Sequence, residues 1–245
     1  MEPAAASTPS KTPEPRAARR GTLSRQVVLE VALRVVDAEG LDALNMRRLG
    51  AELGVDPMSI YNHVRSKDAL LDGIVDLLWE DIPAPPSDGD WVEQLRVFTR
   101  SLRALMRSHP HAAPLVLRRM VLPEPALRAF QARLDILRRA GFETERAAEI
   151  LRTLFSYGAG YALAELTCLC LPGAQQLTTP LSEREILVGL GQMLAPGTSP
   201  DLVETAIVIH TGCDADVCFE TGLDLILQGL ARLAPKRPRT RRRGA

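Results

Sequence analysis

GVDPMSIYNHV, residues 54–64, is the stretch of sequence that decides the fold. Asp56 followed by Pro57 is a typical start of a helix, because aspartate caps the first turn and proline is tolerated at the first helical position. The helix that follows is short, and Ile60 and Val64 supply its inward face at i, i+4 spacing. Its other side chains include a phenol, an amide, a hydroxyl and an imidazole. So many polar groups on so short a helix indicate a surface that another molecule covers.

Two further short helices are expected before this one. From Ser24 the apolar residues recur at helical spacing, and Gly40 marks the end of the first helix. Asn45 can cap the second helix, which ends at Gly54, where glycine permits the left-handed backbone of a tight turn. Three short helices with a glycine-containing turn between the second and the third are typical of a helix-turn-helix. The third helix of such a unit enters the major groove of DNA.

The outward residues of this unit have the chemistry that DNA contacts require. Asparagine can bond adenine through two hydrogen bonds, and a methionine or proline face can pack on a thymine methyl group. Tyrosine, histidine and lysine can bind phosphates, which position a protein without reading sequence. The alternative for Tyr61 and His63 is that they only pack the three-helix unit. We expect the DNA contacts to come from Arg47, Arg48, Pro57, Met58, Ser59, Tyr61, Asn62, His63 and Lys67.

The rest of the chain also has helical periodicity, and no alternating strand pattern interrupts it. Ser66 starts a fourth helix that runs toward the proline-rich residues 83–90, which form the clearest domain boundary. We therefore predict an all-α protein. Its later helices are expected over Trp91–Ser108, in two segments before Gly141, from about Thr144 to Leu171, after a capping box of Ser182 and Glu185, and over Asp214–Leu233.

Composition and charge suggest how the domains are divided. Of 245 residues, 46% are hydrophobic, which is enough to bury a sizeable core. We expect a disordered basic N-terminal arm over 1–22, a helix-turn-helix DNA-binding domain over 23–68, a helical ligand-binding and dimerisation domain over 69–234 and a disordered basic tail over 235–245. Their net charges are +2, −1, −7 and +6. Basic ends suit a polyanionic partner, although the tail could simply keep the chain solvated.

Other classes of protein find less support. No apolar run reaches 18 residues and the N-terminus lacks a secretory signal, so we expect a cytoplasmic protein without a membrane role. Phosphate-loop, zinc-protease and serine-hydrolase motifs are missing, so we expect neither an enzyme nor a cofactor or metal. One alternative stays open, a metal- or thiol-redox-sensing repressor. Its ligands would be cysteines that we otherwise expect to be thiols, with one histidine: Cys168, Cys170, His210, Cys213 and Cys218.

Residues 24–74 contain the specific pattern ALxVVxxxGLxALxMRxLxxELGVxxMSxYxHVxxKxxLL and resemble the DNA-binding domain of TetR-family transcriptional repressors. AGFETERAAEILRTLFSYGAGYALAEL and DADVCFETGLDLILQGLARL more weakly resemble the C-terminal domain of the tetracycline-repressor branch. The resemblance implies a homodimeric repressor of a palindromic operator that loses DNA affinity when a small molecule binds its helical core. It implies DNA contacts for Arg47, Pro57, Ser59, Tyr61, Asn62, His63 and Lys67.

The resemblance does not extend to the metal site of the tetracycline sensors. Leu117 and Ala164 stand where those proteins have a metal-coordinating histidine and glutamate. Tetracycline with magnesium is therefore not the expected effector.

Two residue sets of the second domain are expected to serve dimerisation and ligand binding. Apolar stripes on the two longest C-terminal helices could pair across a two-fold axis or could form the core of one chain. The expected dimer residues are Leu151, Phe155, Gly158, Ala162, Phe219, Leu223, Ile226 and Leu230. A cavity for a mostly apolar effector is expected where aromatic and methionine side chains gather. Its candidate residues, several of which could be ordinary core, are Trp79, Phe98, Leu102, Met106, His109, Met120, Phe130, Leu134, Phe155 and Tyr157.

Overall fold

The computed structural model describes residues 23–118, 123–168, 188, 189, 191, 194–211 and 214–235. All the regular elements in these ranges are helices, which confirms the all-α prediction. None of these helices has an apolar stretch long enough to span a bilayer. In chain order they are α1 (Arg25–Glu39), the 3-10 helix η1 (Leu41–Ala43), α2 (Met46–Leu53), α3 (Pro57–Tyr61), α4 (Lys67–Glu80), α5 (Trp91–Ser108), α6 (Ala113–Arg118), α7 (Glu124–Arg139), α8 (Thr144–Cys168), α10 (Pro200–Thr211) and α11 (Ala215–Leu233).

The three-helix unit forms as the sequence predicts. The side chains of Ser24, Asn45 and Asp56 each accept a hydrogen bond from a backbone amide in the first turn of α1, α2 and α3. Gly54 ends α2 with a φ of 67°, the left-handed conformation that the tight turn needs. One difference is that α3 is shorter than expected. Asn62 is its C-cap rather than a residue of a second turn.

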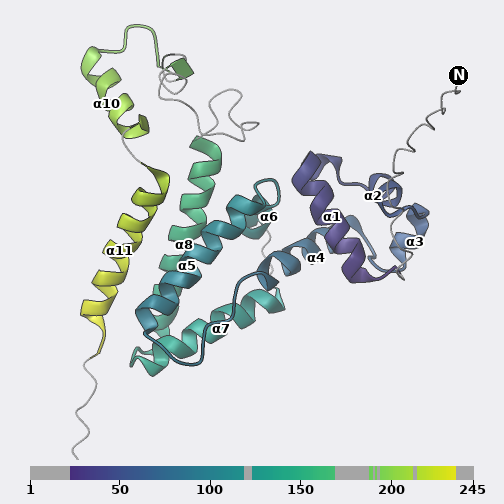
Figure 1. Ribbon diagram of the computed structural model, residues 1–245, viewed down its shortest axis with the longest axis horizontal. Coiled ribbons are helices and arrows are strands. Elements are labelled where there is room, and N and C mark those ends of the chain that lie inside the picture. Colours follow the sequence, from purple (N-terminus) through teal and green to yellow (C-terminus); the bar gives the residue numbers. More distant parts are fainter. Residues whose placement is uncertain are drawn as a thin grey trace, which may run out of the picture.

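α4 connects this unit to the rest of the molecule. Ser66 caps its first turn, so α4 begins where the sequence predicts. α4 lies close against α1, because a Cβ at Gly73 would overlap the side chain of Leu29. The buried core then runs without a break from α1–α4 into α5, α6 and α7. Figure 1 shows α4 leading from the three-helix unit to the larger bundle, with α11 at the opposite edge.

α5 and α8 form the centre of the larger bundle. A Cβ at Gly158 of α8 would lie 2.9 Å from the carbonyl oxygen of Thr99 in α5. The glycine therefore permits close helix contact, and the helix that approaches it belongs to the same chain. Predicted elements over 169–187, including the capping box of Ser182 and Glu185, lie outside the described residues.

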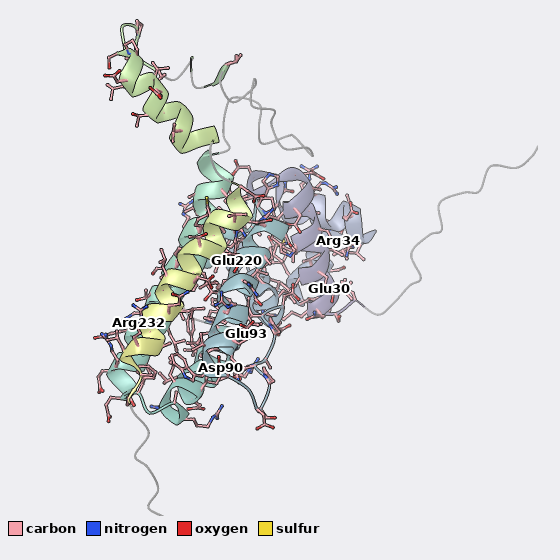
Figure 2. All side chains as sticks on the ribbon, turned by 60° about the vertical axis from the view of Figure 1, so that its left-hand side comes forward. Glu30, Arg34, Asp90, Glu93, Glu220 and Arg232 are labelled. Atoms are coloured by element: carbon pink, nitrogen blue, oxygen red, sulfur yellow. The ribbon has the colours of Figure 1, made fainter. Side chains whose placement is uncertain are left out.

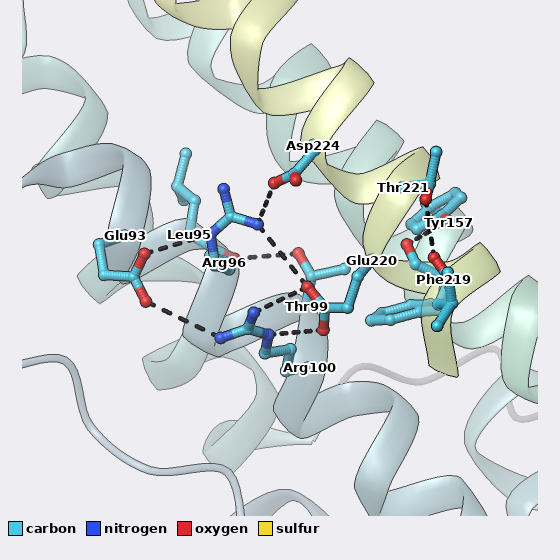
Figure 3. A network of polar contacts seen from close by, with 11 residues as sticks. Glu93, Leu95, Arg96, Thr99, Arg100, Tyr157, Phe219, Glu220, Thr221 and Asp224 are labelled. Atoms are coloured by element: carbon cyan, nitrogen blue, oxygen red, sulfur yellow. Dashed lines mark hydrogen bonds and ion pairs between the residues drawn. The ribbon is translucent and has the colours of Figure 1, made fainter. Parts of the chain in front are cut away.

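α11 is fastened to α5 by charge as well as by apolar packing. Arg100 is bonded to Glu220, with Nε–Oε1 and Nη2–Oε2 distances of 2.7 Å. Arg96, one turn before Arg100 on α5, is bonded to Asp224, one turn after Glu220 on α11 (Figure 3). The bonds to arginine hold the pKa of Glu220 below its usual range. Figure 2 shows α11 lying along the outside of the bundle, with Glu220 on it. Arg103 and Arg107 of α5 also form ion pairs with Asp216 of α11. We call these arginine–carboxylate contacts between the two helices the α5–α11 ladder.

Candidate functional site

A hollow of about 630 Å³ lies where α2, α3 and α4 meet. Arg47, Tyr61 and Lys67 line it and are exposed. The first turns of α2 and α4 also border it, and the N-terminus of a helix carries partial positive charge. Two cations, a phenol and two helix N-termini make this hollow a favourable place for an anion such as a phosphate. The full lining is Asn45, Met46, Arg47, Tyr61, Lys67 and Leu70.

The other expected DNA contacts surround this hollow on α3 and the turn after it. Met58 is 70% exposed, and Asn62 is also exposed. Pro57, Ser59 and His63 are half-buried. An apolar side chain of α3 and the amide of its C-cap, four residues apart, are thus both presented to solvent.

Arg48 has a different environment from its neighbour Arg47. Its guanidinium forms ion pairs with Glu39 at 2.6 Å and with Glu52 at 2.8 Å. The hydrogen bond from Arg48 lowers the pKa of the Glu39 carboxyl group, and the same contact raises the pKa of Arg48. Arg48 therefore joins the end of α1 to α2 inside the unit.

Gly50 is a residue of this site that sequence reasoning missed. A Cβ there would lie 2.9 Å from the carbonyl oxygen of Val55 and 3.2 Å from the Pro57 ring. The missing side chain lets the start of α3 pack directly on α2. A glycine inside a helical pattern was the available signal.

Four of the ten expected ligand residues form one aromatic cluster in the larger bundle. Trp79 lies 5.4 Å from Phe130 and 6.1 Å from Phe155, measured between ring centroids. Phe98 lies 5.9 Å from Phe130. Trp79 comes from α4, so this cluster joins the helix that carries Lys67 to α5, α7 and α8.

The remaining expected ligand residues have other neighbours. Tyr157 stacks on Phe219 and donates a hydrogen bond to its carbonyl oxygen at 2.8 Å. His109 lies 2.9 Å from the carboxylate of Asp37 and so ties α5 to α1. The structure does not bring these two residues to the aromatic cluster. Leu102 and Met106 are buried on α5, Leu134 packs with the α5, α8 and α11 core, and Met120 lies outside the described residues.

A cavity of about 280 Å³ lies between the end of α4, the following linker and α7. Arg133 lines it and is only 2% exposed, with its guanidinium 4.7 Å from the Phe98 ring centroid. Burial lowers the pKa of Arg133 to about 10. Sequence reasoning missed this residue, although an arginine in the apolar stripe of α7 was a signal. The cavity is lined by Trp79, Glu80, Ile82, Ala84, Pro85, Pro125, Arg128, Ala129, Ala132 and Arg133.

Most of the expected dimer residues pack inside one chain. Phe219 and Leu223 of α11 are 0% exposed. Leu151, Ala162 and Gly158 are buried on α8, Phe155 belongs to the aromatic cluster, and Ile226 and Leu230 pack on the same core as Phe219. The outward face of α11 instead has exposed apolar side chains. These are Val217 (61%), Leu225 (70%) and Leu233 (60%).

The cysteine prediction is corrected at one position. Cys218 is disulfide-bonded rather than a free thiol. The side chains of Cys168, Cys170, His210 and Cys213 lie outside what the structure describes. In the described part of the chain, no three histidine, cysteine or carboxylate side chains come together as a metal site.

Comparison with known proteins gives matches along most of the chain. Residues 28–74 match the family model described as bacterial regulatory proteins, tetR family, and residues 82–234 match the tetracyclin repressor-like C-terminal domain. The HTH-type transcriptional repressor DrrR1 of Streptomyces coeruleorubidus is 32% identical, over 94% of this chain and 83% of that protein. The tetracycline repressor protein class E of Escherichia coli is 26% identical, over 85% and 91%. The crystal structure of Streptomyces coelicolor ActR in complex with actinorhodin matches with a TM-score of 0.68 and 31% identity, over 88% of this chain and 100% of that one.

Proposed function

The chain belongs to the TetR family and is a helix-turn-helix transcriptional repressor, and from that premise we propose that it binds a palindromic operator as a homodimer and releases it when a small, mostly apolar effector enters the core. It is not an enzyme. The observation that carries the proposal is the hollow lined by Arg47, Tyr61 and Lys67, with exposed Met58 and Asn62 beside it.

The DNA contacts divide into two kinds by their position. Arg47, Tyr61 and Lys67 surround the hollow and bind phosphates of the backbone. Met58 and Asn62 extend from α3 and its cap and read base edges in the major groove. Pro57, Ser59 and His63 stay as flanking contacts, because they are only half-buried. Arg48 is left out of the set, because two carboxylates already hold its guanidinium.

A second copy of the chain is the partner that we assign to the outward faces of α8 and α11. A palindromic operator requires two recognition helices related by a two-fold axis. The exposed apolar side chains Val217 and Leu225 lie on α11, and a Cβ at Gly160 or Gly229 would meet no described atom within 4 Å. Gly160 of α8 and Gly229 of α11, which have no side chain, allow two such faces to approach closely. Together they make a four-helix interface.

We assign the release of DNA by the effector to α4, because this helix takes part in both the DNA-binding hollow and the aromatic cluster. Its start carries Lys67, and its end carries Trp79 in the aromatic cluster. A ligand shifts an equilibrium only through different affinities for two states. An effector that packs against Trp79 would favour a tilted α4 and so change the separation of the two recognition helices. ActR, which is 31% identical, has been crystallised with actinorhodin, and this supports a ligand-responsive core here.

We also propose that the protein works in the cytoplasm, where its operator DNA lies. The functional division is then a basic arm over 1–22, DNA binding over 23–68, ligand binding and dimerisation over 69–234, and a basic tail over 235–245. Because α4 starts at Lys67, it belongs to both functional parts.

Footprinting on the DNA that flanks the protein's own gene tests the proposal. We expect two protected half-sites, related by a two-fold axis and separated by about one helical turn or a multiple of it. Protection of a single half-site would contradict the proposed homodimer. Binding without any preferred DNA sequence would contradict the proposal of a specific operator.

A further inference from the structure

Arg133 of α7 is a buried cation with no carboxylate partner among the described residues. Its Nη1 donates to the carbonyl oxygen of Ala129 at 3.0 Å, and its Nη2 donates to the carbonyl oxygen of Pro83. Its Nε is buried and has no hydrogen-bond partner in the described part of the chain. Arg103, also buried, differs because it is bonded to Glu165 and Asp216.

An arginine in this position is costly to keep. Burying a charge without a counter-ion is unfavourable, and the lowered pKa of Arg133 reflects that desolvation. The Phe98 ring, 4.7 Å from the guanidinium carbon, offsets part of the cost through a cation–π contact. With a pKa of about 10 the group stays protonated at neutral pH. The free protein therefore holds a desolvated positive charge beside a cavity of about 280 Å³.

The cavity wall is otherwise mostly apolar. Trp79 and Ile82 come from the end of α4, Pro85 from the linker and Ala129 from α7. Two charged groups, Glu80 and Arg128, also line it, and both are exposed. Such a wall suits an apolar ring, and Arg133 suits an anionic group attached to that ring.

We propose that this cavity receives an acidic effector, in which a carboxylate on an apolar body binds Arg133 and the body packs against Trp79. The inference rests on the proposed function and deepens it by naming the chemical class of the effector. A guanidinium that is already desolvated gains more from a carboxylate than an exposed one does, because the cost of removing its water is met before binding.

The same contact gives the ligand a way to act on α4. Pro83, whose carbonyl oxygen accepts a hydrogen bond from Arg133, lies three residues after the last residue of α4. A carboxylate competes with that carbonyl oxygen for the guanidinium. The acid therefore frees the chain at the end of α4, whereas a neutral compound of the same shape leaves it held.

Cyclohexanecarboxylate and its uncharged amide, cyclohexanecarboxamide, test the proposal on the full chain. Trp79 and Trp91 are the two tryptophans of the sequence, so Trp91→Phe leaves Trp79 emission as a reporter of the cavity. We expect the acid to change this emission at a concentration about tenfold or more below that of the amide. Equal affinities for acid and amide, or no binding of either, would overturn the inference without the need for any variant of Arg133.

Two variants assign the preference to one residue. Arg133→Met should abolish the preference for the acid. Arg138→Met, on the same helix but outside the cavity lining, should retain it. A preference that survives in Arg133→Met, with the fold verified by circular dichroism, contradicts the role of Arg133.

Operator binding, measured separately, distinguishes this inference from the proposed function. A protein that binds its operator but shows no acid preference overturns only the inference. A protein that shows the acid preference but binds no operator overturns the proposed function.

Discussion

Trp79 of α4 is stacked on Phe155 of α8, with 6.1 Å between the ring centroids and 17° between the ring planes. Lys67, at the other end of the same helix, lines the hollow on the DNA-binding unit. One rigid helix thus has a cation at one end and an aromatic ring of the core at the other. A change around the Trp79 ring can reach the DNA-binding unit through α4.

Trp79→Ala should weaken release by the effector while operator affinity stays nearly unchanged. Trp79 is only 3% exposed, so the variant should also lose about 3–5 kcal/mol of unfolding free energy. Trp79→Phe, which keeps a ring, is the matched control. It should lose less of the response to the effector and less of the unfolding free energy than Trp79→Ala. Release is measured by fluorescence anisotropy of labelled operator, titrated with a compound that releases the wild type. If Trp79→Ala releases DNA at the wild-type concentration, the coupling through α4 is wrong.

Leu225→Glu should convert the dimer to monomers. Leu225 is 70% exposed in one chain, so a glutamate there costs little in the monomer, but the proposed interface would bury its charge without a partner. Leu127→Glu is the matched control, because Leu127 is a 51% exposed leucine on α7, away from the proposed interface. Sedimentation velocity reports both. A dimer that survives Leu225→Glu excludes this face as the interface.

Arg47→Ala and Arg48→Ala should have different effects, although the two residues are adjacent. Arg47 lines the hollow, so its loss should weaken binding to all sequences alike and reduce the salt slope by about 1. Arg48 holds Glu39 and Glu52, so its loss should lower the urea concentration at which the protein unfolds. Anisotropy at several salt concentrations and urea unfolding measure the two effects. The reverse assignment of effects would mean that Arg48 is the phosphate contact.

The α5–α11 ladder should make stability fall in acid. Bonds from Arg103 and Arg100 hold the pKa values of Asp216 and Glu220 below their usual range. These groups therefore stabilise the fold above their unfolded pKa values, which are about 4, and the contribution is lost as the pH falls through the lower folded values. Urea unfolding as a function of pH measures this. Glu220→Gln should flatten the profile below about pH 4, and an unchanged profile would show that the Arg100 contact contributes nothing.

The local features of the fold could be predicted from the sequence. Asn45 and Asp56 cap their helices as expected, and Ser24 and Ser66 stand at the predicted helix starts, because a cap depends on a side chain and the amides of the next turn. The candidate DNA contacts follow from the same local signals, since caps and turns fix which residues of α2, α3 and α4 face outward. The short length of α3 was less predictable, because helix ends depend on packing.

The long-range contacts could not be predicted in the same way. The stripe of Phe219 and Leu223 shows that a face is buried, but periodicity does not say whether the same chain or a second copy covers it. Arg100 looks like a residue of a solvated face until Glu220, 120 residues later, is placed beside it. Arg133 required the cavity and its missing counter-ion to be seen together.

Binding-site selection from a pool of random duplexes, with the wild type and Asn62→Ala in parallel, tests the central claim most directly. The wild type should enrich an inverted repeat. Asn62→Ala should enrich the same repeat with one position relaxed in each half-site, at a cost of roughly 1–3 kcal/mol in affinity. Enrichment without an inverted repeat, or the same strict repeat from both proteins, would contradict the claim that two copies of α3 and its cap read the operator.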